Sequence, residues 1–113
     1  MTQASYFKGP DTPEIVNTTL GDLLKEAATD VADRTAMIFG HAEIDQRQEW
    51  TYAEMYHEAV LVAQAIASHF KPGERVAIWS QNTPQWILVE FGAAMAGVIL
   101  VTVNPSYQGE ELT

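Results

Sequence analysis

A strand–helix–strand pattern in the second half of the chain constrains the fold more than any other feature. Segments 75–80 and 98–103 are apolar runs without alternation, as is typical of strands buried on both faces of a parallel sheet. Between them, Thr83 is a favourable N-cap, Pro84 suits the first helical position and Gly97 suits a C-terminal stop. This stretch is therefore predicted to be a right-handed βαβ unit, the core of an α/β protein.

Composition excludes several classes of function. The 113 residues suffice for one domain, and the formal net charge of −9 leaves no basic patch for nucleic acid or anionic membranes. The absence of cysteine excludes disulfides, thiolate zinc sites and a cysteine nucleophile. Neither a transmembrane run nor a secretory signal is recognisable, so no membrane span and a cytoplasmic location are expected.

Two further helices and a hairpin are expected before the βαβ unit. Residues 1–18 carry Gly and Pro punctuation and should be extended. Thr19 and Asp22 begin a helix whose expected apolar stripe is Leu20, Leu23, Leu24, Ala27, Ala28 and Val31. Segments 36–39 and 49–51 are short strands expected to pair as a hairpin across a polar, turn-like segment 40–48.

The longest helix is predicted to begin at Thr51, which forms a capping box with Glu54. Its expected buried face is Tyr52, Met55, Tyr56, Ala59, Ala63, Ile66 and Phe70. Its expected solvent face is Glu54, His57, Leu61, Gln64 and Ser68. Segment 71–74, Lys-Pro-Gly-Glu, ends the helix and turns the chain into the first strand of the βαβ unit.

Two features indicate an incomplete α/β fold. The helix after Thr83 is apolar nearly all round, and its Trp86 face lacks a partner in this chain. After a turn at 104–107, segment 108–113 resembles the first turn of another helix, yet two parallel strands do not finish a layered sheet. We therefore expect an extended segment 1–18 and a truncated α/β/α domain 19–113, whose open apolar surfaces favour self-association or aggregation.

The polar loop 80–83 is the first candidate binding site, because it follows a parallel strand and precedes a helix N-terminus. It has no glycine-rich phosphate-binding pattern, so a capping role for Thr83 is favoured. The three histidines, His41, His57 and His69, lack metal-ligand spacing, although His57 could pair with Glu54 on the surface.

Two other groups of residues invite a functional interpretation. Glu110 and Glu111 are consecutive, so on a helix they diverge, and a preference of acids for the helix N-terminus explains them better than a paired-carboxylate site. The aromatics could line an apolar pocket, with core packing the favoured role for Trp79 and Phe91 and no role assigned to Trp86 and Tyr107. No catalytic, cofactor-binding or metal-binding residue is therefore assigned.

The order of motifs resembles the N-terminal segment of AMP-forming acyl-CoA synthetases, in the adenylate-forming enzyme superfamily. The matching stretches are TLGDLLKEAA, EWTYAEM and KPGERVAIWSQNTPQWILVEFGAAMAGVILVTVNPSYQGEEL, over roughly residues 5–113. The ending V-N-P-x-Y-Q and the early SYFKGP are most similar to the branch that acts on medium-chain fatty acids. Asn104, Pro105 and Tyr107 match the turn after the second core strand and are interpreted as structural.

The resemblance implies a two-step ligase. A carboxylate, expected to be a fatty acid, attacks the α-phosphate of Mg²⁺-bound ATP, giving acyl-adenylate and pyrophosphate, and the thiol of coenzyme A then displaces AMP. The family's phosphate loop, nucleotide motifs and C-terminal-domain lysine would follow Thr113, so this chain alone is expected to be inactive and not to bind ATP tightly.

Two alternatives stay open. The chain could be a stand-alone βαβ binding module without catalysis, or part of a member of the same superfamily that activates an aryl or amino acid. Continuation of the reading frame past Thr113 into a Thr/Ser/Gly-rich loop ending Pro-Lys-Gly would favour the ligase. A natural stop there would favour the module.

Overall fold

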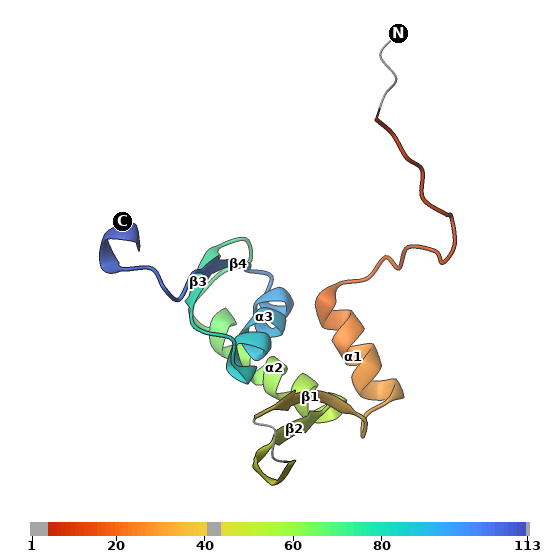
Figure 1. The fold of residues 1–113 in the computed structure, drawn as a ribbon, viewed down its shortest axis with the longest axis horizontal. Coiled ribbons are helices and arrows are strands. Elements are labelled where there is room, and N and C mark those ends of the chain that lie inside the picture. The colour runs from red at the N-terminus through yellow and green to blue at the C-terminus, as the bar shows by residue number, and fades with distance from the viewer. Residues whose placement is uncertain (1–4, 41–43, 113) are drawn as a thin grey trace.

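The computed structural model describes residues 5–40 and 44–112 (Figure 1). The main elements, in chain order, are α1 (Leu20–Asp30), β1 (Thr35–Phe39), β2 (Gln48–Thr51), α2 (Tyr52–Ala67), β3 (Arg75–Trp79), α3 (Pro84–Ala96) and β4 (Ile99–Val103). Single 3₁₀ turns lie at Ile44–Gln46 and Gly109–Leu112. The mixed α/β architecture, with two helices and a hairpin before a βαβ unit, is confirmed.

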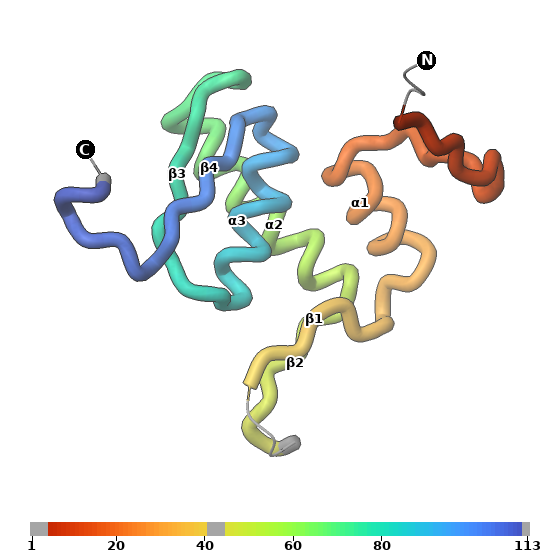
Figure 2. The backbone as a smooth tube through the Cα atoms, turned by 45° about the horizontal axis from the view of Figure 1, so that its top comes forward, coloured from red at the N-terminus to blue at the C-terminus, as the bar shows by residue number. Residues whose placement is uncertain are grey.

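The strands form two separate two-stranded sheets. β1 and β2 pair antiparallel, as the hairpin prediction required, with an irregularity between Thr35 and Met37. β3 and β4 pair in parallel, from Arg75 opposite Ile99 to Trp79 opposite Val103. Figures 1 and 2 show α2 and α3 together on one side of the β3–β4 sheet. Helical cover is thus present on one face of that sheet.

The core lies where three helices meet. Leu24 of α1, Met55 and Ala59 of α2, and Leu88 of α3 form one buried cluster. The contact between α2 and α3 is close because Gly92 has no side chain: a Cβ there would lie 2.6 Å from Val62 Cγ1. A glycine inside a helix carries a propensity cost of about 1 kcal/mol, which this close packing offsets.

Helix ends follow the predicted caps. The Thr19, Thr51 and Thr83 hydroxyls accept hydrogen bonds from the backbone N–H groups three residues on. Thr51 and Glu54 form both bonds of the capping box. Gly97 ends α3 in the left-handed region at φ 72°, a conformation that glycine adopts without the clash of a Cβ. Local sequence signals therefore define where these helices begin and end.

Three expectations about burial and length were wrong. Within the expected α1 stripe, Leu24 is buried but Leu20 and Leu23 are about half exposed. The β3 and β4 strands are not buried on both faces, since Trp79 is 55% and Ile99 48% exposed. α2 ends at Ala67, so Phe70 lies beyond its buried face. The burial errors in α1 and in the sheet have one cause: apolar periodicity identifies a face that can be buried, but a neighbouring element must be present to bury it.

Candidate functional site

The loop after β3 is organised by local hydrogen bonds. Thr83 Oγ1 accepts a bond from the backbone N–H of Trp86 at 3.4 Å, and Ser80 Oγ donates to the carbonyl of Gln81 at 3.0 Å. These bonds hold the start of α3 and agree with the capping interpretation. Pro84, buried at the first helical position, fixes the direction in which α3 leaves the loop.

A small pocket of about 200 Å³ lies between this loop and the hairpin. Its walls are Met37, Ile38 and Phe39 from β1, and Asn82, Thr83, Pro84 and Ile87 from the start of α3. The lining is mostly apolar and contains no Lys or Arg. Such a lining suits an apolar group and does not fit a phosphate, which charged donors or a glycine-rich backbone cradle would hold.

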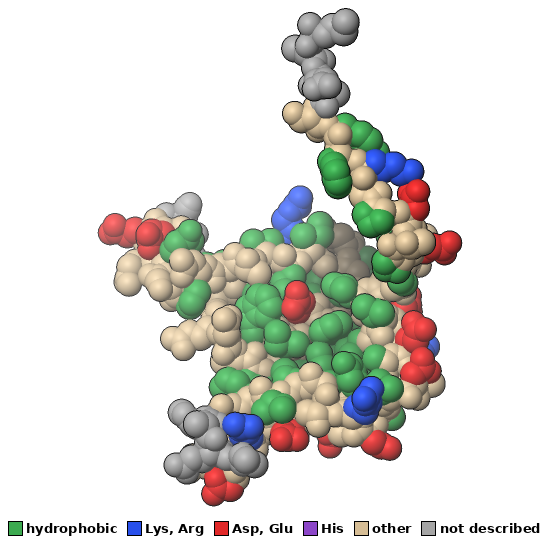
Figure 3. Space-filling view, turned by 45° about the vertical axis from the view of Figure 1, so that its right-hand side comes forward, with side chains coloured by type: hydrophobic (Ala, Val, Ile, Leu, Met, Phe, Trp, Pro, Cys, Tyr) green, Lys and Arg blue, Asp and Glu red, His purple; other side chains and the backbone are tan. Residues whose placement is uncertain are grey.

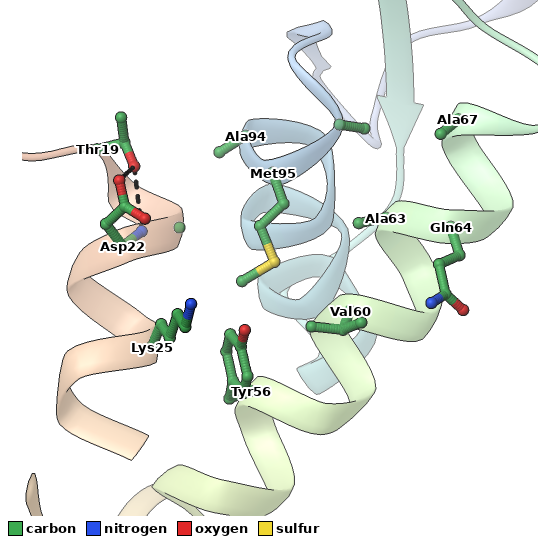
Figure 4. A pocket seen from close by; sticks show the side chains of 12 residues that line it. Thr19, Asp22, Lys25, Tyr56, Val60, Ala63, Gln64, Ala67, Ala94 and Met95 are labelled. Atoms are coloured by element: carbon green, nitrogen blue, oxygen red, sulfur yellow. Dashed lines mark hydrogen bonds between the residues drawn. The ribbon is translucent and has the colours of Figure 1, made fainter. Parts of the chain in front are cut away.

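A larger groove of about 540 Å³ separates α1 from α2 and α3. Its lining residues are Thr19, Gly21, Asp22, Lys25, Tyr56, Val60, Ala63, Gln64, Ala67, Ala94, Met95 and Ala96. Figure 4 shows Lys25, Tyr56 and Met95 projecting into the space between the helices, with alanines along the α2 and α3 walls. The groove thus has an apolar floor and a polar rim.

The polar rim carries no assembled catalytic group. Thr19 Oγ1 donates to Asp22 Oδ2 at 2.7 Å, so this carboxylate is engaged at the start of α1 (Figure 4). The sequence interpretation missed the groove, having placed Tyr56 in the core and Gln64 in solvent. The available signal was Gly21, because a Cβ there would lie 2.9 Å from Met95 Cγ and glycine in a helix indicates a close neighbour.

The other candidates are not brought together. His41 lies outside the described residues, and among those that are described no group of three or more His, Asp or Glu could hold a metal ion. Lys8 and Asp11 form an exposed salt bridge, whereas the described His57 and Glu54 do not pair. Glu111 accepts a bond from the backbone N–H of Gln108 at 2.7 Å, which fits the preference of acids for a helical N-terminus.

The four aromatic candidates lie in different environments. Phe91 packs against the core, as expected. Trp79 is exposed on the sheet face away from the helices, so the expected core role is wrong for it within this chain. Trp86 is half-buried and Tyr107 is exposed beyond β4. These four side chains therefore do not line one pocket.

The carboxylate of Glu54 has a lowered pKa. The backbone N–H of Thr51 donates to Glu54 Oε2 at 2.8 Å and the Thr51 hydroxyl donates to it at 2.9 Å. These two bonds, the backbone one first, lower the pKa of Glu54 below 4.5. The carboxylate is fully exposed and closes the α2 capping box, so its role is structural.

A family model described as AMP-binding enzyme matches residues 24–113. The mouse protein named medium-chain acyl-CoA ligase ACSF2, mitochondrial, is 35% identical over 109 residues, which are 96% of this chain and 17% of that protein. A Bacillus subtilis protein, the putative acyl-CoA synthetase YngI, is 34% identical over 100 residues, or 88% of this chain and 18% of its own length. The chain thus spans less than a fifth of these relatives.

Solved structures show the same fold. The N-terminal subdomain of Klebsiella oxytoca NpsA superposes with a TM-score of 0.73 at 21% identity, over 83% of this chain and 23% of that one. A Mycobacterium tuberculosis fatty acyl CoA synthetase superposes with a TM-score of 0.72 at 25% identity, over 83% and 18%. In the described part of this chain, no helix has the length and apolarity needed to cross a membrane.

Proposed function

Because the chain belongs to the AMP-binding enzyme family, whose model matches residues 24–113, we propose that it is the N-terminal part of the large domain of an AMP-forming acyl-CoA ligase. The observation that carries the proposal is the match of 96% of this chain to 17% of a mouse medium-chain acyl-CoA ligase. In this proposal the chain supplies scaffold, and the reacting groups are bound by residues that follow it in the whole protein.

The proposed reaction has two steps. A fatty-acid carboxylate attacks the α-phosphorus of ATP, so that the bond to pyrophosphate breaks and an acyl-adenylate forms. The sulfur of coenzyme A then attacks the acyl carbonyl, forming the thioester and releasing AMP. Mg²⁺ would neutralise charge on the phosphates. The described residues offer neither a phosphate cradle nor a cluster of metal ligands, so we place no step on them.

The geometry supports a scaffold role through the β3–β4 sheet. Trp79, Ile99 and Val101 lie exposed on its outer face, while α2 and α3 cover the inner face. Parallel sheets in α/β proteins are covered by helices on both faces, and ligands bind beyond the carboxyl ends of their strands. Further strands and helices of the whole enzyme would cover this face and extend the sheet toward the active site.

A chimera tests the proposal. The matching 17% of the mouse ligase is replaced by this chain, and octanoate-dependent release of pyrophosphate from ATP is measured. We expect the chimera to release pyrophosphate and the 113-residue chain alone to release none above the enzyme-free background. Benzoate and an amino acid, assayed in parallel in the natural full-length protein, test the aryl and amino-acid alternatives.

Gly92→Val in the chimera is the matched control, because its side chain would overlap Val62 and separate α2 from α3. Loss of release in this variant alone shows that the scaffold must pack correctly. Turnover by the isolated chain, or a natural stop codon directly after Thr113, would sink the scaffold proposal in favour of a self-contained module.

A further inference from the structure

We propose that the segment before α1 is a strap that folds back into the groove between α1 and the α2–α3 pair, seating Ile15 and Val16 on its apolar floor. The proposal goes beyond the ligase function and does not depend on it. It assigns an occupant to the larger groove and a role to a segment that lies outside the region matched by the family model, which begins at residue 24.

The strap candidate has apolar side chains without partners. Ile15 is 96% exposed and Phe7 92%, and Tyr6 and Val16 are also largely exposed. Figures 1 and 2 show the segment leaving the start of α1 and running away from the helices. Four large apolar side chains within so short an extended segment are unusual for chain that stays in water. A nearby apolar surface is the expected destination for them.

The groove supplies that surface. Val60, Ala63, Ala94 and Met95 form its floor. Figure 3 shows hydrophobic side chains gathered on the face of the helical body below the point where the segment leaves it. The small alanine side chains leave room for two branched aliphatic side chains, and a volume of about 540 Å³ is ample for both.

The segment before α1 is the favoured occupant because it is attached next to the groove and is long enough to enter it. Thr19, the residue at which the segment joins α1, itself lines the groove, and the adjoining Gly21 lies against Met95. Val16 is three residues from Thr19 and Ile15 four, so extended chain lets them travel about 11 and 14 Å. A tethered occupant has a high effective concentration, which gives it an advantage over a second copy of the chain.

Two further observations point to the same occupant. Lys25 stands at the groove rim, and Glu14, next to Ile15, offers a carboxylate of opposite charge. The alignment with the mouse ligase covers 109 of the 113 residues, so it extends into this segment although the family model leaves it out. Seating the strap would hold α1, which has Leu24 as its one buried residue, against the rest of the helical body.

Limited proteolysis tests the strap on the 113-residue chain. A glutamyl endopeptidase cleaves after Glu14, and mass spectrometry follows that bond alone. Ala94→Lys places a charge on the groove floor at an exposed helical position, and Ala65→Lys is the control, also exposed but on α2 outside the groove. We expect cleavage about tenfold faster in Ala94→Lys than in the other two proteins, because cleavage follows the open population. Equal rates in all three would overturn the strap.

Disulfide cross-linking provides a second readout. Because the chain has no cysteine of its own, only the introduced pair can form a disulfide. Val16→Cys with Ala94→Cys should form an intramolecular disulfide about tenfold faster than Val16→Cys with Ala65→Cys, since the strap holds the first pair close. Equal rates for the two pairs would overturn the proposal. A disulfide-linked dimer from the first pair would also overturn it, because a second copy would then be the occupant.

Discussion

The α2–α3 contact and the outer face of the β3–β4 sheet are made from the same kinds of residue but differ in how far their side chains are buried. Leu88 is 6% exposed and packs with Met55 and Ala59 between the helices. Trp79 and Ile99, equally apolar, remain in solvent on the sheet. The difference teaches that apolar content marks surface to be buried, whereas the neighbouring elements decide which surface is buried within this chain.

A matched pair of truncations should separate the two regions most strongly. Leu88→Ala empties a buried site, so we expect the free energy of unfolding to fall by about 3 kcal/mol. Ile99→Ala removes side-chain atoms that are half in solvent and should cost less than about 1 kcal/mol. Urea unfolding of both variants, at a concentration where sedimentation shows monomer, measures the difference. Equal losses would mean that the outer face is already covered.

The success of sequence reasoning follows the same division. The caps at Thr51, Thr83 and Gly97 depend on a few neighbouring residues, so their spacing was enough to predict the helix boundaries. The parallel β3–β4 pairing also followed from the order strand, helix, strand. These are local properties, and the family resemblance through them led to the fold that the solved structures share.

Tertiary features were harder to predict. Leu23 is 48% exposed, and its burial depends on which side of α1 other elements cover, which periodicity does not reveal. The large groove is lined by residues from three helices, including Gln64, which the helical wheel placed in solvent. Gly92 lies in an apolar helix with no side chain to mark it, but α2 and α3 approach closely there. The geometry of the groove could therefore not be predicted from the sequence, although glycines within helices indicated where helices come into close contact.

Self-association should depend on the open sheet face and not on the helical contact. Trp79→Thr with Val101→Thr makes that face polar with side chains that suit a strand, so we expect the association constant to fall at least about tenfold, or 1.4 kcal/mol. Leu61→Gln, on the exposed face of α2, is the control that should leave association unchanged. Sedimentation velocity measures all three proteins. A wild-type chain that is a clean monomer with a sharp cooperative melt would contradict this expectation.

The smallest expected effect compares two helix starts, one in the packed α2–α3 region and one in the loosely held α1. Thr51 and Glu54 form both bonds of a capping box, whereas the Asp22 carboxylate accepts a bond from the Thr19 hydroxyl. Thr51→Ala should therefore cost about 1 kcal/mol, and Thr19→Ala less. Urea midpoints of the two variants test this order, and the reverse order would contradict it.

The same cap predicts a pH dependence whose sign is fixed by Glu54. Hydrogen bonds from Thr51 lower the pKa of Glu54 in the folded chain below its ordinary value of 4.5. The unfolded chain therefore binds more protons as the pH falls, and this contribution to stability is present above pH 4.5 and lost as the pH falls through the lowered pKa. Glu54→Gln should remove that part of the acid sensitivity, measured as urea midpoints between pH 7 and pH 3.

Because Thr51→Ala removes the hydroxyl donor to Glu54, the substitutions Thr51→Ala and Glu54→Gln should combine less than additively in the free energy of unfolding. Full additivity would show that the hydroxyl and the carboxylate act independently on the start of α2.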